Sequence, residues 1–237
     1  MLDWLRAEAS DDLARPRRGE PARQFDVAAY DAMKRAVPEL REVWFDHGRE
    51  EPCMKFRSGR LSTWSDLSDG YHVVLGVVGD IARRSLLLNG MEGPLAVLDV
   101  PGVVMIDEVD LHLHPRWQRR VLDGLRAAFP RLQFVVTTHS PQVLSSVRNA
   151  QVRRLRDARL VERVVHVEGR DSNAILREEM DTDDRDEAGV EWRAAFYRAL
   201  DLGDMPAARA MLEELKRSWG TKDPEVIRAE TLLREEA

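Results

Sequence analysis

GVVMIDEVDLHLHPRWQ, residues 102–118, contains the most informative pattern in the chain. Val103–Ile106 is a continuous apolar run, which is typical of a strand buried on both faces of a sheet. Asp107 and Glu108 follow at the carboxyl end of that strand, and Pro115 suits the first turn of a helix. The stretch therefore predicts a buried strand, an acidic loop and a helix in succession.

The residues after Pro115 predict a second strand parallel to the first. Trp117, Val121, Leu125 and Phe129 recur at steps of four and form one apolar helical stripe, which Pro130 ends. Phe134–Thr138 is the next strand, and the helix between the two strands supplies the crossover that parallel pairing requires. We therefore expect His139 at the same sheet edge as Glu108, and this is the edge where open α/β sheets bind ligands.

Upstream, Asp69–Leu88 carries apolar residues at helical spacing, so a helix is expected to start beside Ser68. The free backbone N–H groups and the positive dipole end of such a helix attract anions, so Ser68, Asp69 and Gly70 can grip a phosphate. Taken alone, the same three residues are an ordinary helix cap.

The flanking segments predict an α/β unit followed by a helical appendage. Residues 1–24 are dense in charge and proline, and we expect a loop or a mobile arm there. Residues 25–46 predict a helix interrupted at Pro38 and followed by a short strand. Two hairpins are expected, one pairing Met54–Phe56 with Leu61–Trp64, the other turning at Asp157–Arg159, and a short helix should follow Pro141.

Beyond Gly169 the sequence changes to helix with acidic interruptions. Residues 181–187 predict a solvated linker. Asp204 can cap a helix that stops at Gly220, and Asp223-Pro224 restarts the helical pattern. We expect residues 1–168 to form the α/β domain and residues 169–237 to form the helical appendage.

Composition narrows the class of protein. A net charge of −6 argues against a broad nucleic-acid-binding face, although a local basic stripe remains compatible with it, so contact with nucleic acid stays open. The single cysteine, Cys53, cannot form an internal disulfide, and residues 1–4 lack the build of a signal peptide, which points to the cytoplasm. The longest central apolar stretch, Val73–Gly79, is far short of the roughly 20 residues that cross a bilayer.

The polar residues at the strand ends suit nucleotide hydrolysis. Asp107 can hold Mg²⁺ directly or through water, and Glu108 can polarise the water that attacks a γ-phosphate. His139 can hydrogen-bond the γ-phosphate or that water, in a polar setting made by Thr137, Thr138 and Ser140. The alternatives are a solvated acidic loop and a histidine satisfied by backbone. His112 and His114 also have the spacing of a metal-binding pair.

No Gly-x-x-x-x-Gly-Lys-[Ser/Thr] run occurs in the 237 residues. A phosphate cradle made of backbone N–H groups and a lysine must therefore come from elsewhere. We expect the isolated chain to be inactive as an ATPase.

Three ordered segments together resemble one bacterial family. LSDGYHVVLGVVGDIARR (67–84), GVVMIDEVDLHLHPRWQRRVL (102–122) and FVVTTHSPQVLSSV (134–147) are similar to ABC-like AAA family ATPases once described as predicted ATP-binding proteins involved in virulence, and met in anti-phage and retron-linked systems. GRDSNAILREEM (169–180) resembles the C-terminal region of that group. The resemblance implies a partial ABC/RecF-like P-loop ATPase fold with parallel core strands.

This resemblance implies a role for each motif. LSDGY matches the ABC signature, in which Ser68 and Gly70 contact the γ-phosphate of ATP held by the opposite protomer. Asp107 matches the Walker B acid that binds Mg²⁺, Glu108 the catalytic glutamate and His139 the switch histidine. The implied partners are an ATPase protomer that supplies the P-loop and an effector protein bound by the C-terminal helices. No association with a membrane is expected.

Two other readings of the sequence stay open. One is a partner-docking module that keeps the ATPase shape without catalysis. The other is an OLD-like Toprim nuclease, because VHVEGRDS (165–172) has the Glu-Gly start of such a metal-dependent domain. Asp181 and Asp183 have the spacing of its later acidic pair but lie in a charged stretch without a strand pattern.

Overall fold

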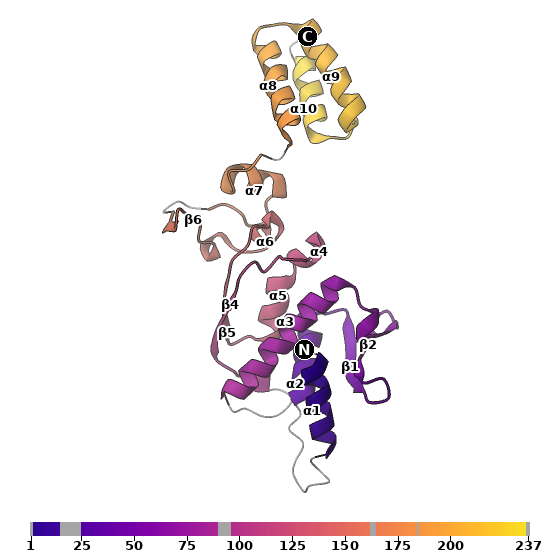
Figure 1. The fold of residues 1–237 in the computed structure, drawn as a ribbon. Coiled ribbons are helices and arrows are strands. Elements are labelled where there is room, and N and C mark those ends of the chain that lie inside the picture. Colours follow the sequence, from indigo (N-terminus) through magenta and orange to yellow (C-terminus); the bar gives the residue numbers. More distant parts are fainter. Residues whose placement is uncertain (1, 15–24, 90–95, 162–164, 184, 236–237) are drawn as a thin grey trace. The chain divides into compact units, whose positions relative to one another are not determined.

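The computed structural model describes residues 2–14, 25–89, 96–161, 165–183 and 185–235 (Figure 1). They form two compact units, Met1–Ile175 and Leu176–Ala237. The first unit mixes helices with three small sheets, and the elements described in the second are helices. The expected α/β class and the helical C-terminal region are therefore confirmed.

The first part of the chain builds an antiparallel sheet beside two helices. Its elements are α1 (Leu2–Ala14), α2 (Phe25–Ala36), β1 (Leu40–Asp46), β2 (Glu51–Phe56) and β3 (Leu61–Thr63). The strands pair in the order β1-β2-β3, and β2 and β3 are the expected hairpin, with Gly59 in a left-handed conformation at its turn. The helix that ends before Pro38 and the strand after it are also confirmed.

The prediction of a loop over residues 1–24 is wrong for residues 2–14, which form α1. Leu5 and Ala9 lie four residues apart on this helix and are 0% and 4% exposed. Leu5 and Ala9 are the buried side chains among those of α1 that the structure describes, and stabilisation of a helix by such tertiary packing leaves little apolar periodicity in the sequence. Residues 15–24 lie outside the described part of the chain.

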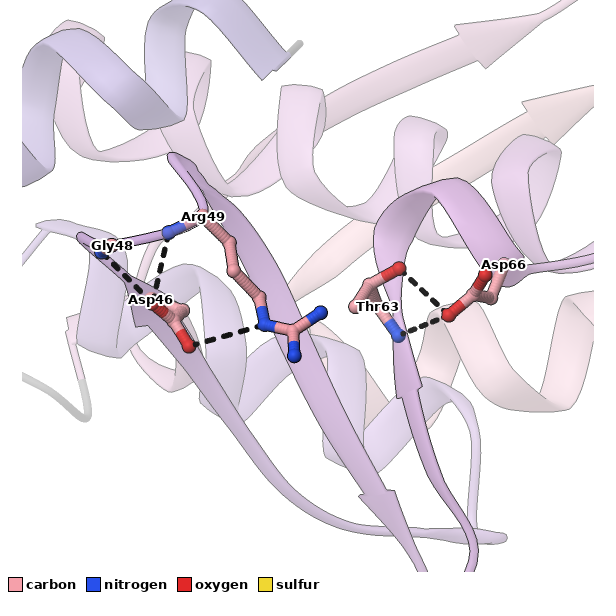
Figure 2. A network of polar contacts seen from close by, with 5 residues as sticks. All are labelled: Asp46, Gly48, Arg49, Thr63 and Asp66. Atoms are coloured by element: carbon pink, nitrogen blue, oxygen red, sulfur yellow. Dashed lines mark hydrogen bonds and ion pairs between the residues drawn. The ribbon is translucent and has the colours of Figure 1, made fainter.

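Two acidic side chains accept hydrogen bonds next to the strand ends of the antiparallel sheet (Figure 2). Asp46 Oδ1 accepts hydrogen bonds from the backbone N–H groups of Gly48 (2.9 Å) and Arg49 (3.0 Å) in the β1–β2 turn. Asp66 Oδ2 accepts from the Thr63 hydroxyl (2.9 Å) and the Thr63 N–H (3.3 Å) at the end of β3. The bonds from Thr63 lower the pKa of the Asp66 carboxyl. Both carboxylates serve turn formation.

The long helix α3 (Asp69–Asn89) begins directly after Ser68, as expected. It packs with α2 and with α5 (Val121–Ala128). The largest fully buried side chains of this core include Met33, Leu75, Leu125 and Phe129. The close approach of α2 and α5 needs Gly124, because a Cβ atom there would lie 2.6 Å from the carbonyl oxygen of Ala36.

The segment after Pro115 forms two helices where the sequence predicts one. They are α4 (Pro115–Gln118) and α5, and Arg120 between them has φ −119. Val121, Leu125 and Phe129 are buried as predicted, while Trp117 turns to α3 and is half-buried. The apolar residues of this segment thus pack against two different neighbours, which explains why the helix breaks between α4 and α5.

The central pair of strands is parallel. β4 (Gly102–Ile106) pairs with β5 (Leu132–Val136) in a register that joins Gly102 to Leu132 and Ile106 to Val136, and the strands are seen side by side in Figure 1. The prediction that β4 is buried on both faces is wrong for the described chain. Val103 is 61% and Met105 79% exposed, because β4–β5 is a two-stranded sheet here and one of its faces is open.

The remaining elements of the first unit are short. α6 (Pro141–Ser145) follows β5 as predicted, and β6 (Leu155–Arg156) pairs with β7 (Arg159–Leu160) across Asp157 and Ala158, both in left-handed conformations. The predicted hairpin is present with shorter strands, and residues 162–164 lie outside the described part. The other short elements are the 3-10 helices Trp64–Asp66, Ala96–Leu98 and Asn149–Gln151. The helix α7 (Ser172–Glu179) contains the boundary between the two units.

The second unit is built from α8 (Glu187–Asp201), α9 (Met205–Trp219) and α10 (Pro224–Glu235). Asp204 caps α9 by accepting from the Ala207 N–H at 3.1 Å, and Gly220 ends it, so both predicted boundaries are confirmed. The buried core includes Phe196, Leu212 and Leu215. Each helix in the described part of the chain is too short or too polar to cross a membrane.

Candidate functional site

The sequence-predicted acidic pair and histidine follow the carboxyl ends of two adjacent parallel strands. Asp107 and Glu108 come directly after β4, and His139 comes three residues after the end of β5. We call residues 107–113 the acidic loop and residues 137–140 the histidine loop. Because the pairing is parallel and in register, both loops leave the sheet at the same edge, as expected.

Thr137 ties the two loops together. Its backbone N–H donates to the Ile106 carbonyl and its carbonyl accepts from the Val109 N–H, both at 3.0 Å. Its hydroxyl oxygen accepts from the Glu108 N–H at 2.8 Å, and the hydroxyl donates to Asp107 Oδ1. Thr137 thus continues the backbone pairing beyond the ends of β4 and β5. It also holds the carboxylate of Asp107 and the backbone of Glu108 in place.

A second set of hydrogen bonds holds the outer part of both loops. The Thr138 hydroxyl donates to Asp110 Oδ1 at 2.5 Å. The buried Ser140 donates its hydroxyl to Gln118 Oε1 at 2.8 Å, and the Gln118 amide donates to the Leu113 carbonyl at 2.8 Å. The acidic loop, the histidine loop and α4 are therefore one connected polar structure.

The acidic loop contains two strained residues. Glu108 (φ 50) and His112 (φ 60) adopt the left-handed conformation that is uncommon for residues other than glycine. Such a conformation costs on the order of 1 kcal/mol and persists only where the surroundings enforce it. The hydrogen bond from the Glu108 N–H to Thr137 supplies that constraint. It fixes the backbone of Glu108 directly after the end of β4.

The three side chains with the predicted chemical roles are open to solvent. Asp107, Glu108 and His139 are all exposed. Within the described residues no hydrogen bond or ion pair involves the Glu108 carboxylate or the His139 imidazole. These groups are thus available to a ligand, whereas an acidic pair that only caps a turn would be bonded in the manner of Asp46 and Asp66.

Asp107 has the chemistry that a magnesium site on a nucleotide needs. One of its oxygens is bonded to Thr137, which fixes the carboxylate in place. Among the residues that the structure describes, no group of three or more acidic, histidine or cysteine side chains could enclose a metal ion. Mg²⁺ fits such a sparse site, because it uses one or two carboxylates together with phosphate oxygens and water.

His112 and His114 do not form a metal centre within the described chain. His114 Nδ1 instead accepts a hydrogen bond from the Arg116 N–H at 3.3 Å and caps α4. His112 is exposed on the strained part of the acidic loop. The pairing suggested by their spacing therefore has no third ligand here.

Ser68, Asp69 and Gly70 lie at the start of α3, where the Ser68 carbonyl accepts from the N–H groups of Tyr71 (2.9 Å) and His72 (3.1 Å). Gly70 packs on the indole of Trp117, and a Cβ atom there would approach it to 3.0 Å. No described contact joins Ser68 or Gly70 to Asp107, Glu108 or His139 within this chain. The three residues thus form a separate feature, beside α4.

Sequence reasoning missed Asp110 and Gln118. Each is bonded to a residue more than 20 positions away, Thr138 and Ser140, so no local pattern indicates their role. The polar cluster Thr137, Thr138 and Ser140 was the available signal, because two of its members are the bonding partners of Asp110 and Gln118.

The comparisons with known families identify the first part of the chain. A family model described as "AAA domain, putative AbiEii toxin, Type IV TA system" matches residues 3–145, which is more than half of the chain. The match includes the start of α3, the acidic loop and the histidine loop.

Two named ATPases and one further protein are among the similar sequences. "Retron Vc95 probable ATPase" of Vibrio cholerae serotype O1 biovar El Tor is 36% identical over 124 residues, or 52% of this chain and 24% of that protein. "Retron Ec83 probable ATPase" of Escherichia coli is 40% identical over 110 residues, or 46% and 20%. "Septu protein PtuA" of Bacillus mycoides (strain KBAB4) is 35% identical over 127 residues, or 52% and 17%. The chain thus matches a quarter or less of the length of these relatives.

Among solved structures, one from work titled "Structural biochemistry of ATP-driven dimerization and DNA stimulated activation of SMC ATPases" covers 69% of this chain and 96% of its own. The identity is 15% and the TM-score 0.43. At this level of similarity, the family match and the sequence relatives remain the basis for assigning the chain.

Proposed function

The chain belongs to the family of AAA domains described as putative AbiEii toxins of type IV toxin–antitoxin systems, and from this membership we propose that it contributes one edge of an ATP-hydrolysing site. ATP with Mg²⁺ is the proposed substrate. The similarity to two proteins named probable ATPases supports the reaction class.

The observation that carries the proposal is the hydrogen-bonded edge made by the acidic and histidine loops. Two exposed carboxylates and an exposed imidazole leave adjacent parallel strands at the same end, and Thr137 fixes the first two. A group that must act on a γ-phosphate needs such positioning, because catalysis of phosphoryl transfer is almost entirely positioning and electrostatic stabilisation.

We assign the roles by the chemistry of each side chain. Asp107 would hold Mg²⁺, which neutralises charge on the phosphates when bound. Glu108 would orient the attacking water and draw its proton, and His139 would donate a hydrogen bond to the γ-phosphate or to that water. The fixed Glu108 backbone and the free Glu108 carboxylate suit a group that must point at a small reactant.

The phosphate cradle would come from residues outside these 237, either in the same polypeptide or in another protomer. Ser68, Asp69 and Gly70 would then contact the γ-phosphate of a nucleotide held by the opposite protomer. Their separation from Asp107 and Glu108 within one chain supports a role across a dimer. The positive dipole end of the 21-residue helix α3 favours an anion there.

ATP-driven dimerisation would control an effector protein bound to the C-terminal helices α8–α10, and hydrolysis would reset the complex. The retron and Septu names of the relatives support a place in anti-phage defence. The self-contained core of the second unit supports a separate docking role for it.

The test is ATP turnover by a complex of this chain with a P-loop-bearing segment. Glu108→Gln should lower the turnover number by about 100-fold or more while leaving ATP binding intact. Glu214→Gln, an exposed glutamate on α9, is the matched control and should have no effect. Equal turnover by Glu108→Gln and Glu214→Gln would exclude the proposed site, and the 237-residue chain alone should show no turnover.

A further inference from the structure

An arginine-lined pocket lies apart from the acidic edge. It has a volume of about 400 Å³ and is lined by Pro115, Arg116, Arg119 and Arg120, at the junction of α4 and α5. The three arginines converge there because α4 ends at Gln118 and the chain turns at Arg120 before α5 begins at Val121. Its lining of three arginines and one proline suits an anion.

The charges of the pocket are only partly neutralised. Arg120 Nη1 donates to Glu39 Oε1 at 2.5 Å, and Glu39 is the carboxylate paired with these arginines. Arg119 Nε donates to the Gln142 side-chain carbonyl, a neutral acceptor. In the described part of the chain, no hydrogen bond or ion pair reaches the Arg116 guanidinium. Three arginines against one glutamate leave two positive charges, in a chain whose net charge is −6.

The walls of the pocket are fixed by packing. Trp117 next to Arg116 contacts Gly70 and meets the Tyr71 ring edge-on with centroids 4.9 Å apart. Arg119 is anchored to Gln142 on α6, and Arg120 to Glu39 before β1. Arg119 and Arg120 are thus held in place before a ligand binds, which lowers the entropy lost on binding.

We infer that this pocket binds a terminal phosphate group. Such a group carries about −1.5 to −2 charges near pH 7, which matches the excess of two positive charges, and has three strong acceptor oxygens. The guanidinium fork of arginine suits phosphate oxygens, and a carboxylate offers fewer acceptors and half the charge. The inference does not rest on the proposed ATP hydrolysis, because Asp107, Glu108 and His139 do not line the pocket.

The probe is tripolyphosphate, with binding to the 237-residue chain measured by calorimetry at low ionic strength. Arg116→Gln and Arg119→Gln should each weaken binding by about tenfold or more, since each removes charge-assisted hydrogen bonds. Arg126→Gln removes an exposed arginine of α5 that pairs with Asp123, and it should leave binding unchanged. None of these variants alters Asp107, Glu108 or His139, so the result is separate from the fate of the ATPase proposal.

A second probe distinguishes the sources of the phosphate. A 5′-phosphorylated oligonucleotide that competes with tripolyphosphate, while its unphosphorylated form does not, identifies a nucleic-acid end as a ligand. Competition by neither form, with tripolyphosphate still bound, identifies a small polyphosphate or nucleotide. Equal losses in Arg116→Gln and Arg126→Gln, or no binding of tripolyphosphate, would overturn the inference.

Discussion

Thr137 is the residue on which the geometry of the proposed ATPase edge depends most. Its hydroxyl receives the N–H of the strained Glu108 and donates to the carboxylate of Asp107. Because both bonds use one oxygen, its loss would release the first carboxylate and the backbone of the second together.

Thr137→Val keeps the shape of the side chain and removes the hydroxyl. We expect the free energy of unfolding to fall by about 1 kcal/mol, as for a typical hydrogen bond, and turnover by the P-loop complex to fall by about tenfold. Urea unfolding and steady-state turnover measure the two effects. Thr137→Ser restores the hydroxyl and should restore activity; a valine variant as active as the serine variant would refute this role.

Because of Glu39, the stability of the fold should depend on pH in the acidic range. Burial alone would raise the pKa of its carboxyl, but hydrogen bonds from its own backbone N–H and from Arg120, with the charges of Arg120 and Arg116, hold the pKa below its ordinary value of 4.5. A lowered folded-state pKa adds stability above the unfolded-state value and loses it as the pH falls through the folded-state value.

The stability advantage of the wild type over Glu39→Gln should therefore be full at neutral pH and should be lost progressively as the pH falls below the ordinary carboxyl pKa of 4.5. Unfolding midpoints measured across this range test the expectation. Glu42→Gln is the control, because Glu42 pairs with Arg41 at 3.4 Å on the exposed surface and should contribute little. An advantage over Glu39→Gln that does not change with pH would contradict the assignment.

At the scale of single residues, the sequence predicts the acids and the histidine because they directly follow apolar strands. It does not predict Asp110 or Gln118, whose partners are set by the parallel pairing of β4 and β5. The arginines of the pocket are visible as a basic run, but their convergence depends on the break between α4 and α5.

At the scale of elements, the contact between α2 and α5 limits what the fold tolerates. Gly124 on α5 faces the Ala36 carbonyl at the end of α2, at a distance of 2.6 Å from any added Cβ atom. A backbone carbonyl cannot move aside as a flexible side chain can, so a larger residue must push the helices apart.

Gly124→Ala should lower the free energy of unfolding by about 1–3 kcal/mol through this clash. Gly76→Ala on α3 is the matched control, since a Cβ atom there meets nothing within 4 Å. It should raise stability by about 0.5–1 kcal/mol, because alanine favours the helix interior. Urea unfolding of both variants measures the two effects. Similar midpoints would show that α2 and α5 are not in tight contact.

The strands and most helices follow from patterns that act locally. Pro115 and Pro141 mark helix starts, Asp204 and Gly220 mark the limits of α9, and apolar runs mark β4 and β5. α1 escapes prediction because tertiary packing, seen at the buried Leu5 and Ala9, leaves little apolar period in its sequence. An apolar run by itself predicts a strand covered on both faces, whereas the open face of β4 follows from the lack of a further strand beside β4–β5 in the described chain.

At the scale of the whole molecule, the open face of the β4–β5 sheet is the feature that most needs a partner. Val103, Met105 and Val135 alternate with half-buried neighbours and are 61%, 79% and 47% exposed. An exposed apolar strand face promotes association, so we expect the 237-residue chain to self-associate.

Replacing Val103 and Met105 together by threonine should reduce this self-association without loss of stability, because both side chains are exposed and threonine suits strands. Sedimentation velocity measures the effect. Leu202→Ser changes a single apolar residue, 78% exposed, in the second unit and should leave association unchanged. Monodisperse wild-type chain would show that the open face is harmless.

The solution mass of the P-loop complex carrying Glu108→Gln, measured by light scattering with and without ATP, tests the central claim most directly. If the acidic edge hydrolyses ATP held between two protomers, ATP should double the mass and keep it doubled, and adding Ser68→Arg should abolish the doubling. A mass that ATP leaves unchanged while Ser68 and the P-loop are intact would contradict the account.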